Sequence, residues 1–472
     1  MKSALLFVGL FAILFVAPLF ITTAVAVPAV EPAPLRDKTL VAWVAPANLV
    51  QRGGVLTLDA GQGLFDGIVF GEQTPKKWMP GSEGWRRTQP DQAEWPAETA
   101  DGKEYDIWAE AIEPKVKQVM GDNAISPVSQ KPLDTRPEWE MGPFVKLAAP
   151  VLSPAAESKF QCPLQGKEVR WEEQNVYNPA VVVRGGKVYL LYRADDKCWW
   201  KFGTEDQATS RIGLASSEDG RHFTRHPLPV VFPDKDAFTK YEWPGGCQDL
   251  HVVEGEDGIY YMNYTAWGEG GMDSMCVATS KDLIHWQKHG PAFAKFAPGA
   301  VRSSRSGVIV ARQAGEKLLP VKVNGQYLMY YTHPSALAVS DNLIDWKPLG
   351  KQVWGGGHES GAIALWRDEG ILLFFNSQDH SADVNLPTGS WTLGQALIDR
   401  ANLTTVLRHQ QRPLLQPVFD WEKKGYCPVP ATVSNGLVYF KGEWLLYYGA
   451  ADRHIGLAVF TPKANSPFSL AH

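Results

Sequence analysis

Two carboxyl side chains stand where a glycine-rich turn meets an apolar strand. Asp249, in GGCQDLHVVE, follows a Gly pair that lets the backbone come close to a ligand. Its neighbours Cys247 and Leu250 are expected to raise the pKa of its carboxyl by desolvation. Glu359, in GGGHESGAIAL, lies between a Gly run and an apolar strand. A protonated Asp249 and an ionised Glu359 would form a general acid and base. The alternatives are a turn-capping Asp249 and a Glu359 in a surface loop.

Cationic side chains accompany these carboxyls. Arg302 and Arg305 flank a Ser pair in VRSSRSG and are the candidate ligands for a phosphate or carboxylate. His358 could bind substrate, orient its neighbour or pair with phosphate. Arg193 and Asp195 follow LLY and could grip hydroxyl groups or hold the shape of the pocket. For each of these residues a structural role, as a solvated or internally paired side chain, is the alternative.

Neutral side chains suited to sugar binding occur at other strand ends and loops of the chain. Asn178, in YNPA, has an amide that can both donate to and accept from a hydroxyl group. Trp243 and Trp267, like Trp199 and Trp200, fall in predicted loops that would rim a pocket. Aromatic faces stack on the apolar side of a sugar ring. Packing between strands is the alternative for each tryptophan.

A two-part sequence repeat, which occurs five times, must position these residues. Its first part is an apolar, aromatic strand, and its second part follows after a turn. The first parts are KVYLLYRADD, GIYYMNYTAW, GQYLMYYTHP, GILLFFNSQD and GEWLLYYGAAD. The second parts recur about every 60 residues, and repetition at a fixed period indicates a repeat architecture. Short strands joined by Gly, Asp and Asn turns predict an all-β fold, a five-bladed β-propeller. A propeller gathers the inner strand of each blade around one axial pocket.

The first 142 residues differ in character from the repeats. Residues 1–26 carry a long apolar run followed by Ala-Val-Ala, which predicts a secretory signal peptide, with an uncleaved membrane anchor as the alternative. Residues 27–36 are Pro- and Ala-rich and predict a linker. From residue 37 the chain resembles the start of laminin-G/concanavalin-like modules, and we interpret 37–142 as a truncated β-sandwich-like extension. Residues 143–472 form the predicted propeller domain.

Charge and cysteine content narrow the class of protein. The net charge of −5 predicts no nucleic-acid partner, and no stable membrane contact is expected once the signal peptide is cleaved. Export, to the periplasm or the outside of the cell, permits disulfides. The five cysteines leave at least one thiol free, and Cys162–Cys198 is the predicted bridge. No metal motif is present, and no cofactor is expected.

Several segments resemble glycoside hydrolase family 130, which contains β-mannoside phosphorylases and β-mannosidases on five-bladed propellers. The segments are WEEQNVYNPAVV, LLYRADD, SRIGLASSEDGRHF and YYGAADRHIGLA, together with RSGVIVA and HESGAIAL. The resemblance implies that Asp249 is the proton donor and that Asp452, in GAADRHIG, binds sugar hydroxyls. For Asp452, blade closure is the alternative. An inverting cleavage of a β-mannoside would use Asp249 as acid and Glu359 as base.

One motif departs from the family pattern. Where the family carries Glu-Asp-Pro-Arg, this chain has Gln248, Asp249, Leu250 and His251. The missing Arg weakens a phosphorylase interpretation, because a phosphate co-substrate needs fixed cations. Export also favours hydrolysis. We therefore predict an exported glycoside hydrolase with a carbohydrate substrate. An inverting phosphorylase and a non-catalytic carbohydrate-binding propeller are the alternatives.

Overall fold

The computed structural model describes two separate parts of the chain. It covers residues 137–472 except 302–303, 333–335, 353–358, 379–385, 411–412, 464–465 and 470–472, and earlier in the chain the strands between residues 39 and 87. The chain divides into two compact units, Met1–Pro137 and Glu138–His472. The predicted signal peptide and linker lie outside the described residues. Within the part that the structure describes, no helix is long and apolar enough to cross a bilayer.

The N-terminal unit contains short antiparallel strand pairs. Strand β1 pairs with β4, β2 with β3, and β5 with β6. Their bounds are β1 (Thr39–Val44), β2 (Leu49–Arg52), β3 (Val55–Leu58), β4 (Phe65–Gly71), β5 (Trp78–Gly81) and β6 (Gly84–Arg87). These strands all lie within residues 37–142, where the sequence predicts a small β-rich extension.

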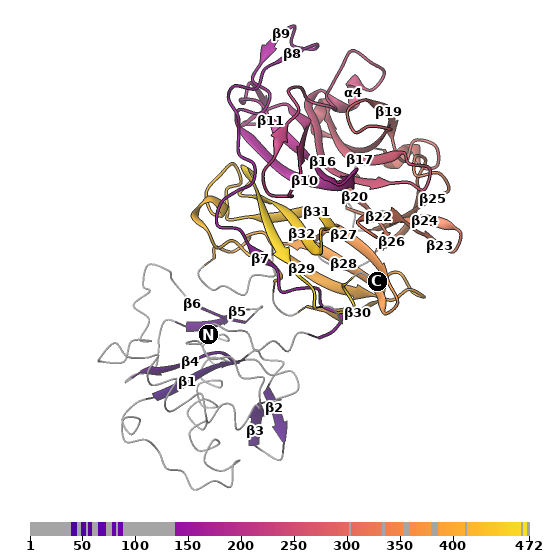
Figure 1. The fold of residues 1–472 in the computed structure, drawn as a ribbon. Helices are drawn as coiled ribbons and strands as arrows, with labels where there is room; N and C mark the ends of the chain where they lie inside the picture. The colour runs from indigo at the N-terminus through magenta and orange to yellow at the C-terminus, as the bar shows by residue number, and fades with distance from the viewer. Residues whose placement is uncertain are drawn as a thin grey trace. The chain divides into compact units, whose positions relative to one another are not determined.

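The C-terminal unit is a five-bladed propeller, and each blade is built from four antiparallel strands (Figure 1). From the axis outward, blade one contains β10 (Asn175–Arg184), β11 (Lys187–Asp195), β14 (Ser210–Ser217) and β15 (Thr224–Arg225). Blade two contains β16 (Pro244–Glu254), β17 (Tyr260–Gly268), β18 (Asp273–Ser280) and β19 (Trp286–Pro291). Blade three contains β20 (Arg305–Ile309), β24 (Gln326–Thr332), β25 (Ala336–Ser340) and β26 (Lys347–Gln352). The repeated phrases of the sequence are the second and third strands of the blades.

The last two blades close the ring. Blade four contains β27 (Glu359–Arg367), β28 (Gly370–Ser377), β29 (Thr392–Ile398) and β30 (Val406–His409). Blade five contains β31 (Thr432–Phe440), β32 (Glu443–Ala450), β33 (His454–Phe460) and, as its outer strand, β7 (Val145–Lys146). Each inner strand contacts the next around the axis, and β31 contacts β10. The start of the propeller domain therefore supplies the strand that completes its last blade.

Smaller elements decorate the blades. They are the hairpins β8 (Phe160–Cys162) with β9 (Lys167–Val169), β12 (Trp200–Phe202) with β13 (Glu205–Gln207), and β21 (Ala311–Ala314) with β22 (Lys317–Pro320), the strand β23 (Lys322–Val323), and the helical turns α4 (Thr239–Glu242), η6 (Glu269–Gly271), η7 (Pro298–Ala300) and η8 (Asp420–Glu422). The hairpin β12–β13 connects β11 to β14 and lies close to the site described below.

Apolar side chains fill the space between adjacent blades. Five buried clusters each join strands of two neighbouring blades, including the pair formed by blades five and one. Blade strands are apolar on both faces because both faces are covered. Trp346, which ends one repeated phrase, is fully buried between blades two and three, as the sequence predicts for packing.

The Asp or Asn residue that recurs in the repeats forms a turn between the third and fourth strands of a blade. Asp219 accepts hydrogen bonds from the backbone amides of residues 221 and 222 at 2.8 Å. Asp282 and Asn342 make the same pair of bonds in blades two and three. Such side-chain-capped turns explain why Asp or Asn recurs at this position.

A buried glutamate is clamped in three of the blades by a tyrosine and a cation. Glu242 accepts hydrogen bonds from Tyr264 at 2.7 Å and Lys288 at 2.6 Å, and Glu172 lies between Tyr192 and Arg225. In blade five Glu422 accepts from Tyr448 and Lys146, both at 2.7 Å. In each case the tyrosine lies on the second strand and the cation on the fourth. The clamp therefore fastens the outer strand to its blade.

All five cysteines are free thiols, so the predicted Cys162–Cys198 disulfide is wrong. Cys162 is buried at the end of β8, where the Arg211 guanidinium lies 3.5 Å from its sulfur. Cys198 instead contacts Gln174, at 3.3 Å from its amide nitrogen. Each sulfur has its own polar partner, and the spacing of the two residues in the sequence did not reveal this.

Replacing Lys146 with Met is expected to lower the free energy of unfolding by about 3 kcal/mol, because Glu422 would keep a buried charge without its cation. Urea-induced unfolding followed by tryptophan fluorescence measures this change. Lys187→Met removes an exposed ion pair with Glu218 and serves as the matched control, with no measurable change expected. Equal stability of the two variants would contradict the role of the clamp.

Candidate active site

Each of the five inner strands has a break in its pairing register at a corresponding position. The pairing register shifts between Tyr177 and Ala180 in β10, between Gln248 and His251 in β16, and similarly in β20, β27 and β31. In the first three blades, the residues within the shift that have positive φ are Asn178 (45°), Asp249 (43°) and Ser306 (46°). Asn and Asp tolerate this conformation better than other side chains do. A bulge re-aims the side chain that it carries.

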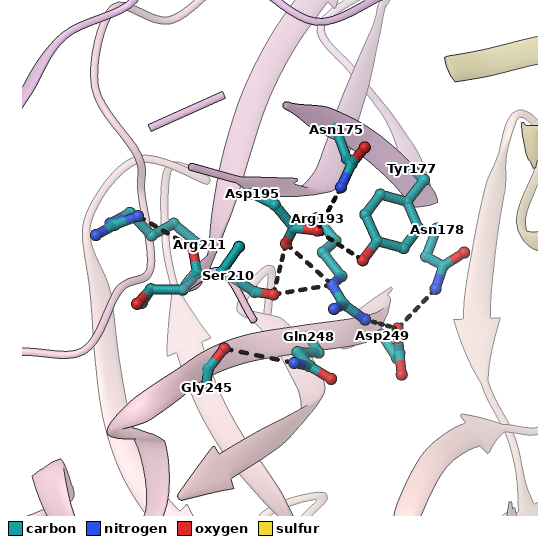
Figure 2. A network of polar contacts seen from close by, with 12 residues as sticks. Asn175, Tyr177, Asn178, Arg193, Asp195, Ser210, Arg211, Gly245, Gln248 and Asp249 are labelled. Carbon is teal, nitrogen blue, oxygen red and sulfur yellow. Dashed lines mark hydrogen bonds and ion pairs between the residues drawn. The ribbon is translucent and has the colours of Figure 1, made fainter. Parts of the chain in front are cut away.

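Asp249 is the centre of a polar cluster that joins three blades. Figure 2 shows the part of the cluster that blades one and two contribute. Its carboxylate accepts a hydrogen bond from Asn178 at 2.6 Å and lies 3.3 Å from Nη1 of Arg193, both in blade one. Arg305, from the first position of β20, donates through Nε at 3.1 Å and through Nη2. Asp249 is only 7% exposed, so these contacts replace most of its hydration. The structure thus brings together four of the predicted site residues.

Asp195 fixes the position of Arg193. It accepts hydrogen bonds from Asn175 at 3.1 Å, Tyr177 at 2.8 Å and Ser210 at 2.6 Å, and lies 3.4 Å from Nε of Arg193. The Arg193 guanidinium also lies over the Tyr177 ring, 4.6 Å from its centroid. A cation held on several sides in this way presents a preorganised charge to Asp249.

The electrostatics of Asp249 differ from the prediction. Burial raises the pKa of its carboxyl, as expected from Cys247 and Leu250. The charges of Arg305 and Arg193, with the hydrogen bonds from Arg305 and Asn178, outweigh burial and hold the pKa well below its usual range. The predicted raised pKa of Asp249 is therefore wrong, because sequence neighbours did not reveal the two arginines that meet it.

Asp452 has the opposite shift. It lies in the turn after β32, where Ala451 and Asp452 have φ of 49° and 52°. Burial raises the pKa of its carboxyl to about 6; the Arg193 charge lowers it, and the negative charges of Asp249 and Asp195 raise it further. Asp249 and Asp452 are thus two interacting carboxyls whose pKa values are pushed apart.

The other predicted residues fall in three groups. Arg302 and His358 lie outside the described residues. Glu359 is the first residue of β27, and its side chain also lies outside the description. Trp243 and Trp267 are partly buried and lie in ring contacts with Trp199 and Trp200. Among the described parts of the chain, no group of three or more His, Cys, Asp or Glu residues could hold a metal ion.

His251 lies away from this cluster. Together with residues of all five inner strands it lines a small axial cavity of about 30 Å³. Burial lowers the pKa of its imidazole to about 4, and Nδ1 has no hydrogen-bond partner among the described residues. A neutral ring in this position adds no cation to the site.

The sequence analysis missed four members of the cluster. Asn175 and Tyr177 lie on the same face of β10 because they are two residues apart, a signal available in NVYN. Ser210 pairs in register with Asp195, which the sequence does not reveal. Asp273 lies 3.4 Å from Arg305 and comes from the neighbouring blade.

The model of glycoside hydrolase family 130, described as β-1,4-mannooligosaccharide phosphorylase, matches residues 153–464. A 1,2-β-oligomannan phosphorylase from Thermoanaerobacter sp. (strain X514) is 32% identical, over 66% of this chain and 95% of the relative.

Solved structures of glycoside hydrolases are also similar to this chain. A structure of a putative glycoside hydrolase from Parabacteroides distasonis is 35% identical, with a TM-score of 0.65 over 70% of this chain and 99% of that one. Another, described in connection with family 130 glycoside hydrolases that target β-1,2 mannosidic linkages in Candida mannan, is 33% identical, with a TM-score of 0.65 over 71% and 99%. The chain, with its propeller and its charged axial cluster, belongs to glycoside hydrolase family 130.

Proposed function

We propose that this protein is an exported enzyme that hydrolyses β-1,2-mannosidic bonds with inversion. The observation that carries the hydrolytic half of the proposal is the charge balance of the cluster. Among the described residues, the guanidiniums of Arg193 and Arg305 face the carboxyls of Asp195, Asp249 and Asp452. Each arginine is already paired. A phosphate dianion needs unpaired cations, whereas a neutral sugar and water do not.

The choice of linkage comes from the relatives. The oligomannan phosphorylase and two β-1,2-mannobiose phosphorylases, at 31% and 26% identity, are named for β-1,2-linked substrates. The structure at 33% identity is described with hydrolases of the same linkage. The family model names a β-1,4 linkage instead, so the test below includes both.

The proposed reaction uses a coupled pair of carboxyls. Water attacks the anomeric carbon, the glycosidic C–O bond breaks, and the leaving oxygen takes up a proton. Asp249 contacts the reacting sugar and delivers the proton. Because Asp249 is ionised in the free site, the proton that it delivers must first come from Asp452, whose carboxyl binds one below about pH 6. Glu359, whose main chain starts β27, is the proposed base that receives a proton from the attacking water.

Phosphorolysis is the second candidate, because a relative at 32% identity is a named phosphorylase. In that reaction a phosphate oxygen would replace water and produce mannose 1-phosphate. Arg302 and His358 are the residues that would bind phosphate. The proposed export favours hydrolysis, because a sugar phosphate formed outside the cytoplasm is difficult to recover.

The protein is expected to release mannose from β-1,2-mannobiose in phosphate-free buffer, with the α-anomer formed first, and to act more slowly on β-1,4-mannobiose. Proton NMR identifies the anomer and would detect mannose 1-phosphate. Asp249→Asn and Glu359→Gln should each reduce kcat about 10²- to 10⁴-fold. Asp345→Asn, at an ion pair with Lys295 remote from the site, is the control and should keep full activity. Turnover that requires phosphate would establish the phosphorylase. Binding without turnover would indicate a carbohydrate-binding propeller.

The dependence of kcat/KM on pH should reveal the interaction between the carboxyls of Asp249 and Asp452. A proton donor must be protonated, and the raised pKa of about 6 means that the proton is present below pH 6 and lost above it. We therefore expect kcat/KM to fall as the pH rises through about 6, and Asp452→Asn to remove this limb of the profile. A profile that is flat from pH 5 to 8, or one that the Asp452→Asn change leaves intact, would contradict the pairing.

A further inference from the structure

An aromatic surface lies beside the charged cluster and takes no part in the proposed reaction. Its exposed members are Trp199 and Phe202, with 44% and 45% of their surface accessible. They belong to the connection between β11 and β14, which contains the hairpin β12–β13. We call Trp199 and Phe202, with the partly buried Trp243 and Trp267 that support them, the aromatic platform.

The rings of the platform are held in fixed orientations. Trp199 packs on Trp243 with ring centroids 5.2 Å apart, and Phe202 packs against Trp267 at 5.7 Å. The indole N–H of Trp199 donates to the Thr209 hydroxyl at 2.9 Å. The ring faces are therefore preorganised, which lowers the entropic cost of binding a ligand. The sequence pointed to Trp199, Trp200, Trp243 and Trp267 alike. Of these, Trp243 and Trp267 are partly buried and lie beneath the rings that reach solvent.

The platform is continuous with the charged cluster through one strand end. Thr209, which holds the Trp199 ring, also donates to the backbone oxygen of Pro244 at 2.9 Å. The next residue, Ser210, binds both Asp195 and Arg193. Asp195 and Ser210 are the paired residues from which the connection leaves the blade. A ligand bound at Asp249 thus has the platform next to it on the same end of blade one.

The size and chemistry of the platform fit a sugar chain. A Trp or Phe side chain has a surface of about 150–250 Å², so the exposed fractions of Trp199 and Phe202 leave on the order of 200 Å². A stable protein interface needs about 800 Å² from each partner. The platform is flanked by the exposed polar side chains of Lys201, Glu205 and Asp206, which can bind hydroxyl groups. Apolar ring faces beside polar groups match the two sides of a pyranose.

We propose that the aromatic platform binds the part of an oligosaccharide beyond the bond being cleaved, so that the enzyme favours mannosides of three or more units over the disaccharide. This inference rests on the proposed function, since it takes the mannoside cleaved at Asp249 as the chain that continues onto the platform. It assigns Trp199 and Phe202 to specificity for chain length.

The test compares chain lengths. Trp199→Ala is expected to raise KM for β-1,2-mannotetraose about five- to tenfold, with kcat unchanged and with KM for β-1,2-mannobiose within twofold of wild type. Trp199→Phe keeps a ring face and should recover most of the loss. Phe296→Ala removes an equally exposed ring, 46% accessible, from a loop of blade two and should change neither KM. Circular dichroism checks the fold of each variant.

Other outcomes would overturn the proposal. Equal losses on both chain lengths would mean that Trp199 acts on the cluster and not on the distal sugars. A change in molar mass by light scattering in Trp199→Ala, with KM unaltered, would identify the platform as a contact between copies of the chain. If the wild-type protein cleaves no mannoside, the proposed function fails. Calorimetry with β-1,2-mannotetraose then tests the platform separately: binding that Trp199→Ala abolishes supports it, and no binding overturns it.

Discussion

The burial of one ionised carboxylate on the propeller axis governs how the first three blades meet. Asp249 comes from blade two, Arg193 and Asn178 from blade one, and Arg305 from blade three. A buried charge is costly unless opposite charges and hydrogen bonds replace its hydration. The cluster can satisfy Asp249 only when all three inner strands reach the axis at the same height. The contacts of Asp249 are therefore complete only when the inner strands of all three blades are in place.

The bulges supply the local geometry that this meeting requires. A regular strand alternates its side chains between the two faces of the blade, and these faces are covered by neighbouring blades. The inner-strand bulges interrupt the alternation, and at Asn178, Asp249 and Ser306 the backbone takes up positive φ. Backbone strain of this kind persists where surrounding contacts determine it, and such positions cluster at functional sites. Beyond the bulges, the same strands return to apolar side chains that pack between blades.

The fold could be predicted because each repeat is recognisable from residues that are close together in the sequence. The site, in contrast, depends on contacts between blades. The repeated strand phrases and the Asp or Asn turns at Asp219 and Asp282 are readable from the sequence alone. Candidate site residues such as Asn178 and Asp249 were found from strand ends and family motifs. The pKa of Asp249 could not be predicted, because Arg305 lies 56 residues away in the sequence. The two side chains meet only because blades two and three are neighbours around the axis. The Glu–Tyr–cation clamps were missed for the same reason: Lys146 meets Glu422 across 276 residues.

The charge balance of the cluster connects the proposed substrate with the proposed chemistry. Since Asp195 and Asp249 already engage Arg193, the negative charge near Asp452 is only partly compensated, and this adds to burial in keeping a proton on Asp452. Among the residues that the structure describes, the same excess of carboxyls disfavours the approach of a phosphate dianion. A neutral sugar entering the site would displace water and strengthen every one of these interactions, because the effective dielectric falls. In the proposed hydrolysis, this imbalance among the described residues would both disfavour phosphate as a co-substrate and keep a proton available.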